Sequence, residues 1–129
     1  LRRVSTFLPR STGKNRNEMR RAEELLKLPV RIGGVRLGRA VDLIVAPDAD
    51  RALGFDILCG DGAHRFLPFP VATLEADAIK IDSPLVLLDF DQVGFYRDQA
   101  TTLRERNGQA EGVLVDRDGT LGGLARQPR

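Results

Sequence analysis

Acidic side chains gather in residues 34–58 and are the first candidates for chemistry in this chain: Asp42, Asp48, Asp50 and Asp56. Two carboxylates that converge in a pocket could move protons, and a carboxylate-rich loop could hold a cation. A calcium loop of the helix–loop–helix kind needs a central glycine and a glutamate at its twelfth position, and neither is present here. The pattern instead predicts aspartates at turns or on solvated strand positions. We therefore predict no metal site and no catalytic carboxylate pair.

A single cysteine and a single histidine are the other residues that could do chemistry. Cys59 falls on the inward face of a predicted strand, which predicts a buried and unreactive thiol. His64 follows a turn at residues 60–63 and is expected to be exposed, and one histidine without a second cysteine is too little for a metal site. The glycines of residues 32–38 are not followed by Gly-Lys-Ser/Thr, so they do not form a phosphate loop. We therefore predict a non-enzymatic protein with no catalytic residue, no cofactor and no small-molecule substrate.

Alternating apolar residues predict the strands that must position these side chains. In residues 38–46, Val41, Leu43 and Val45 share one face, while Asp42 and its alternate neighbours face the other way. Three more segments alternate in the same way between tight turns: residues 52–60, 64–69 and 77–83. The first of these has an inward set: Leu53, Phe55, Ile57 and Cys59. Short strands joined by turns every eight to twelve residues predict a mainly β protein, a small barrel or sandwich.

Helical patterns flank the predicted strands. Residues 18–27 are rich in strong helix formers and end before a proline, which predicts a short N-terminal helix. Residues 90–108 carry apolar side chains at helical spacing and end at an Asn-Gly pair, which predicts a C-terminal helix. Residues 84–90 are apolar on both faces, so we expect a helix or a partner subunit to cover them. Residues 109–129 predict a hairpin that begins a second, partial copy of the first strands.

Charge is distributed unevenly along the chain. Residues 1–21 carry seven basic groups and one acidic group, a net charge of +6, whereas the other 108 residues carry 13 basic and 17 acidic groups, a net charge of −4. We interpret residues 1–18 as a basic, disordered leader and residues 19–89 as the barrel. A folded part with this charge does not fit a phosphate-binding surface, so nucleic acid is not an expected partner. The lone cysteine fits a reducing cytoplasm, and the apolar runs are too short for a transmembrane helix.

Residues 28–83 resemble the PRC-barrel family, which is named for the cytoplasmic domain of the photosynthetic reaction centre H subunit. The resemblance follows the order of the family pattern, from a strand with an aspartate-rich turn to a Leu-Gly-aromatic strand and a Phe-hydrophobic-Pro motif: Gly38, Asp42, Pro47, Gly54, Phe55, Phe66 and Pro68. The family often has aspartate in place of Ala46 and glycine in place of Asp50, so the turn is expected to differ in type. The resemblance covers under half of the chain. It implies a small PRC-type β-barrel between the two predicted helices.

The family also implies an interaction or assembly module rather than an enzyme. One branch includes the C-terminal domain of a 16S rRNA maturation factor that binds a ribosomal protein, so a ribosome- or RNA-maturation-associated role is the first alternative. A membrane-surface accessory role through the basic leader is the second alternative. We expect a protein partner or a second copy in a homodimer, contacted through two apolar sets of residues: Leu85, Val86, Leu87, Leu88, Val93, Tyr96 and Leu103. The last three lie on a stripe at helical spacing, and such a stripe more often faces the core of its own chain than a partner.

Overall fold

The structure is a computed structural model that describes residues 19–90 and 100–124. The larger of its two sheets contains β2 (Pro29–Ile32), β3 (Val35–Val45), β4 (Ala52–Cys59), β5 (His64–Pro68), β6 (Thr73–Leu74), β7 (Ile79–Lys80), β8 (Leu88–Asp89) and β9 (Thr101–Thr102). The smaller sheet contains β1 (Arg20–Arg21), β10 (Leu114–Val115) and β11 (Leu121–Gly122). Short helical segments join the strands: α2 (Ala22–Leu25), η1 (Phe69–Val71), η2 (Pro84–Val86) and α4 (Leu103–Asn107).

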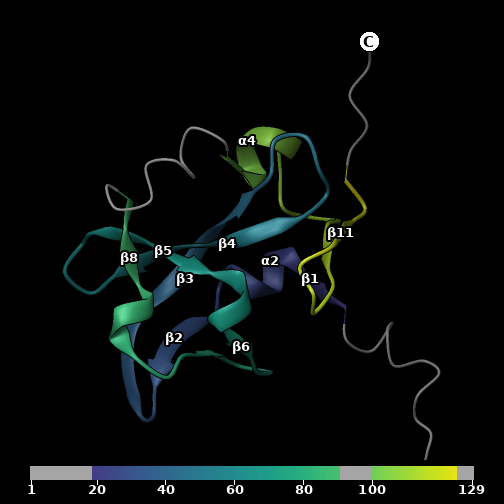
Figure 1. Cartoon of the computed structure of the whole chain (residues 1–129). Helices are drawn as coiled ribbons and strands as arrows, with labels where there is room; N and C mark the ends of the chain where they lie inside the picture. The colour runs from purple at the N-terminus through teal and green to yellow at the C-terminus, as the bar shows by residue number, and fades with distance from the viewer. Residues whose placement is uncertain (1–18, 91–99, 125–129) are drawn as a thin grey trace, which may run out of the picture.

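The larger sheet is curled. Its strand order is β6-β7-β2-β3-β4-β5-β8, and β9 pairs with the C-terminal end of β3. All of these pairs are antiparallel except β2 with β7. Figure 1 shows the sheet bending from β6 through β2, β3 and β4 to β8, with the smaller sheet on the other side of the molecule. The prediction of a mainly β fold is confirmed, in the form of a curled half-barrel.

The central hairpin of β3 and β4 lies where the alternation predicts it, but three residues face the other way. The register shifts between Ala40 and Asp42, so Val41 is an extra residue that forms a β-bulge. As a result Ala40 is fully buried and Val41 is only half-buried, the reverse of the prediction. A second shift near the turn leaves Leu53 on the outer face, packed against a separate apolar cluster. A bulge moves side chains between faces because the side-chain period of a strand is two.

The core lies inside the curl. Its largest fully buried side chains come from all along the described chain: Leu25, Val30, Leu43, Val45, Phe55, Ile57, Leu67, Ile79, Ile81, Leu103, Val113 and Val115. The rings of Phe55 and Phe69 stack at a centroid distance of 5.6 Å. The C-terminal hairpin of β10 and β11 pairs with β1, and Val115 and Leu121 join this same core. The predicted hairpin therefore completes the core of the first unit instead of standing apart from it.

The N-terminal helical segment is short. Within residues 19–27, the described part of the predicted helix, only the four residues of α2 are helical, and Arg20 and Arg21 form strand β1. The backbone N–H of Ala22 donates to the carbonyl oxygen of Val113, which fixes α2 to the C-terminal hairpin. In the described ranges, no helix has both the length and the apolar character needed to cross a membrane.

The C-terminal helix differs from its prediction. Residues 91–99 of the predicted helix lie outside the described residues. The prediction of a helix is wrong at Thr101 and Thr102, which form β9. The helix α4 begins at Leu103, and Thr102 caps it by accepting the N–H of Glu105 at 3.1 Å. It ends at Gly108, whose φ is +87°, as the Asn-Gly pair predicts.

Residues 84–90 are partly exposed among the described residues. They form η2, whose N-terminal turn is capped by the Ser83 hydroxyl oxygen, and then the edge strand β8. Leu85 is 83% exposed, so no described element of this chain covers it, and cover by a partner subunit stays a prediction. Arg65 holds β8 to the turn before β5 through contacts of 3.0 Å to Asp61 and 3.1 Å to Asp89.

Candidate functional site

The acidic turn between β3 and β4 is held by an arginine from α4. Arg106 Nη1 donates to the carbonyl oxygens of Ala46 and Ala49, and its Nη2 donates to Asp50 Oδ1 at 2.7 Å. The arginine is partly shielded, with 23% of its side chain exposed. Pro47 lies in the same turn and is exposed. These contacts give Asp50 a structural role in joining the turn to α4.

The second acidic turn, at residues 116–120, is explained by its own hydrogen bonds. Asp118 Oδ1 accepts the N–H of Thr120 at 2.9 Å, and this bond lowers the pKa of Asp118. Gly119 has a φ of +93°, which suits the turn of a hairpin at an Asp-Gly pair. Across residues 19–90 and 100–124, no three His, Cys, Asp or Glu side chains gather as metal ligands. Neither turn therefore offers a cation site among the described residues.

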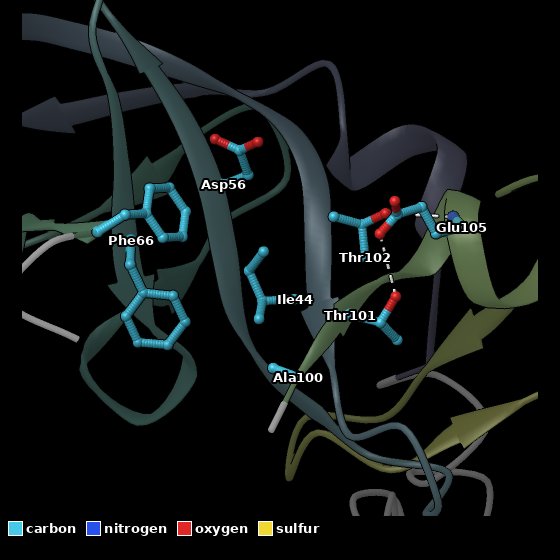
Figure 2. A pocket seen from close by; sticks show the side chains of 8 residues that line it. Ile44, Asp56, Phe66, Ala100, Thr101, Thr102 and Glu105 are labelled. Atoms are coloured by element: carbon cyan, nitrogen blue, oxygen red, sulfur yellow. Dashed lines mark hydrogen bonds between the residues drawn. The ribbon is translucent and has the colours of Figure 1, made fainter. Parts of the chain in front are cut away.

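A groove of about 370 Å³ lies on the outer face of the larger sheet, opposite the core. Ile44 of β3 and Phe66 of β5 are buried in its floor, in an apolar cluster separate from the core. Phe90 and Ala100 extend this floor, and the rings of Phe66 and Phe90 lie 6.3 Å apart. Figure 2 shows Ile44 between Phe66 and the β9 residues. An outward strand face thus carries a second apolar surface.

Polar side chains form the rest of the groove. Asp56 Oδ1 lies 2.8 Å from Nδ1 of His64, and 18% of the Asp56 side chain is exposed. On the α4 side, Thr101 donates its hydroxyl to Glu105 Oε1 at 3.1 Å, the dashed line in Figure 2. Thr102, the cap of α4, lies beside this pair. The groove therefore joins an apolar floor to two carboxylates that local hydrogen bonds hold in place.

Asp42 lies directly opposite Asp56 in the pairing of β3 with β4. Only 13% of its side chain is exposed, so the prediction that it is solvated is wrong. Burial raises the pKa of Asp42, and this outweighs four opposing effects. The two largest are the hydrogen bond from the N–H of Leu43, at 2.9 Å, and the charge of Arg104, whose Nε lies 3.8 Å away. Hydrogen bonds from the backbone of Arg104 and from the side chain of Thr102 act in the same direction.

We expect Asp42→Asn to make the protein more stable than wild type at neutral pH. Because the pKa of Asp42 is raised by folding, the native state holds this proton more tightly than the unfolded state. The stabilising contribution is complete below the ordinary pKa of 3.8 and is lost as pH rises through the folded-state value. Asparagine keeps an oxygen for the N–H of Leu43 and removes the buried charge. Urea unfolding from about pH 3.5 to 7 should show wild type losing stability relative to the variant.

Asp118→Ala is the control of opposite sign. The pKa of Asp118 is lowered by folding, so its contribution is present above the ordinary pKa and is lost as pH falls through the folded-state value. This variant should be less stable than wild type at neutral pH, with the difference shrinking in acid. A wild type that gains stability over Asp42→Asn as pH rises would contradict the raised pKa.

The residues that carry the family resemblance have structural roles here. Gly38 and Gly54 lie where neighbouring strands leave no room for a Cβ atom. Phe55 is fully buried in the core, whereas Phe66 forms the floor of the groove. Pro68 is the last residue of β5, where its missing N–H coincides with the end of the strand.

The predicted interface residues divide into three groups. Leu103 is fully buried in the core, so its assignment to an interface is wrong. Leu85 is exposed, and residues 86–88 are half-buried. Val93 and Tyr96 lie outside the described residues. An apolar stripe at helical spacing marks a core-facing side as readily as a binding side, so the spacing alone does not distinguish a core position from an interface position at Leu103.

Sequence reasoning missed the groove and the pair of Asp56 with His64. The alternation placed Ile44 on the outer face. It gave no sign that β9 would pair with β3 there, or that Ala100 would pack against the cluster of Ile44 and Phe66. Two signals were available. The spacing of Thr102 and Glu105 is that of a capping box and marks the start of α4. Hairpin register also brings Asp56 and His64, eight residues apart, to the same face.

No protein-family model matches the chain, and no curated protein matches it in sequence. The assignment of a function therefore depends on the geometry of the described residues. Apolar and charged side chains meet in the groove on the outer face of the larger sheet, so the groove is the candidate functional site.

Proposed function

We propose that this protein is a non-enzymatic interaction module of the PRC-barrel type that binds a segment of a partner polypeptide in its outer-face groove. The observation that carries the proposal is the cluster of Ile44 and Phe66, which lies outside the core. Outward positions of an antiparallel sheet with one solvated face are ordinarily polar. Apolar pockets with a few polar groups are the usual receptors for the anchoring side chains of a partner.

The polar residues of the groove support binding rather than catalysis. Asp56 contacts His64, Glu105 accepts from Thr101, and Thr102 caps α4, so each has a structural partner. The free thiol of Cys59 is buried on the inner side of the sheet, away from this groove. These residues hold the shape of the groove.

Charge supports a polypeptide partner over a nucleic acid. The described residues include 12 Lys and Arg and 15 Asp and Glu side chains, which gives a net charge of −3. Nucleic-acid binding needs basic groups gathered on one surface. A ribosome-associated role would therefore depend on contact with a protein and not with RNA. We place the module in the cytoplasm, in keeping with its buried free cysteine.

Selection of random peptides displayed on phage, with the full chain as bait, tests the proposal. We expect the selected peptides to share a large apolar residue. Ile44→Thr should weaken their binding about tenfold, because it places a hydroxyl in the apolar floor. Leu85→Thr is the matched control, since Leu85 is exposed and does not line the groove, and it should leave binding unchanged.

Ala100→Leu is a second variant at the groove, and it should weaken binding by filling the space that the peptide needs. Selected peptides that bind both groove variants as tightly as wild type would refute the proposal. Loss of binding only with Leu85→Thr would move the interface to residues 85–88. A dimer in sedimentation equilibrium that Ile44→Thr dissociates, without peptide selection, would make a second copy the occupant and overturn the proposed partner.

A further inference from the structure

We infer that the groove selects a partner segment in which a lysine or arginine adjoins the apolar side chain. This inference rests on the proposed function and specifies the chemistry of its ligand. The groove brings a carboxylate from β4, Asp56, and one from α4, Glu105, to the apolar floor around Ile44 (Figure 2). Both carboxylates have local partners but keep their negative charge, so a ligand that complements the groove has an apolar part and a cationic part.

The distance between the Asp56 carboxylate and the apolar floor suits one or two adjacent side chains of a ligand. Asp56 pairs directly with Phe66 across β4 and β5, and side chains of such pairs lie about 5 Å apart. Ile44 pairs with Gly54, which precedes Asp56 by two residues and faces the same side. A lysine or arginine bound at Asp56 would therefore lay its methylene groups over the Phe66 ring.

The charges around the groove favour a cation. Among the described residues, its lining contains two carboxylates and neither lysine nor arginine, and the basic group nearest to Asp56 is the ring of His64, 2.8 Å away. Three arginines adjoin lining residues in the sequence, and each has acidic partners elsewhere: Arg104 contacts Asp42, Arg106 contacts Asp50, and Arg65 contacts Asp61 and Asp89. Asp56 is mostly shielded from water, and a shielded carboxylate attracts a cation more strongly than an exposed one. The charge pattern thus complements a basic segment.

Three probes of similar shape test the inference by amide NMR titration of the full chain: 2-phenylethylammonium, 2-phenylethanol and 3-phenylpropanoate. We expect the ammonium probe to shift the amide signals of β3, β4 and β5 and to bind about fivefold more tightly than the alcohol. The carboxylate probe should bind most weakly. About 0.5 M salt should reduce the preference, because the charges are then screened.

Asp56→Asn and Glu105→Gln should each reduce the preference for the ammonium probe about twofold to threefold, with little effect on the alcohol. Asp82→Asn, at an exposed carboxylate outside the groove, is the matched control and should leave the preference unchanged. Amide spectra of the free variants verify that each one is folded. If Asp56→Asn disturbs the fold, Glu105→Gln alone tests the preference for the ammonium probe, since Glu105 is exposed and its substitution should leave the fold intact.

The outcomes separate the inference from the proposed function. Equal binding of the three probes, weakened by Ile44→Thr, would overturn the charge selectivity and leave the proposed function in place. An ammonium preference that survives both Asp56→Asn and Glu105→Gln would also overturn the selectivity. Signal shifts confined to residues away from β3, β4 and β5 would overturn the proposed function itself.

Discussion

Gly54→Ala is expected to lower the free energy of unfolding by about 3 kcal/mol or more. A Cβ atom at Gly54 would collide with the carbonyl oxygen of Leu67 and would lie 2.6 Å from Cε1 of Phe66. The Leu67 oxygen belongs to the backbone of the paired strand β5, so the clash can be relieved only by separating the strands. Chemical denaturation should show a lower midpoint with an unchanged slope.

Gly34→Ala is the matched control. Gly34 lies in the turn between β2 and β3, and no atom lies within 4 Å of the Cβ position. Its substitution should change stability by less than about 0.5 kcal/mol. Gly38→Ala should resemble Gly54→Ala, because its Cβ would lie 2.5 Å from the carbonyl oxygen of Leu58. Equal stabilities for Gly54→Ala and Gly34→Ala would show that β4 and β5 can separate at little cost.

The fold could be predicted where local pattern decides it. Alternation located β3 and β4, and the Asn107-Gly108 pair located the end of α4. The bulge at Val41 could not be predicted, because the same residues alternate equally well with either face inward. The curl of the sheet and the pairing of β1 with β10 join residues far apart in sequence, and no local pattern encodes such contacts.

The candidate site was less predictable than the fold. Ile44 and Phe66 are apolar residues on strands that the sequence did locate, but on the outer face they are packed by residues from other segments: Leu53, Leu88, Phe90 and Ala100. Asp42 and Asp56 alternate as solvated residues would, yet the β3–β4 pairing places them opposite each other and largely shields both. Burial of a polar residue is a property of its neighbours, and its own type gives little sign of it.

Phe55→Ala is expected to lower the free energy of unfolding by about 3–5 kcal/mol. Phe55 is fully buried, and its ring stacks on Phe69 inside the curl of the sheet. Removing the ring leaves a cavity and ends the contact that joins β4 to η1. For a domain of this size that loss is a large part of a total stability of about 5–15 kcal/mol. Urea denaturation followed by circular dichroism measures it.

Phe55→Leu is the control, and it should cost much less, about 1–1.5 kcal/mol, because most of the buried volume is kept. Similar losses for the two variants would mean that the stacked ring, and not the filled volume, stabilises this part of the core.

Phe55 faces the core and Ile44 faces the groove, so variants at Phe55 should affect stability and variants at Ile44 should affect peptide binding. Folded Phe55→Leu should bind the selected peptides as wild type does, whereas Ile44→Thr should lose affinity at a smaller cost in stability. A peptide affinity that falls equally in both variants would show that the two faces of the sheet are coupled through β3 and β4.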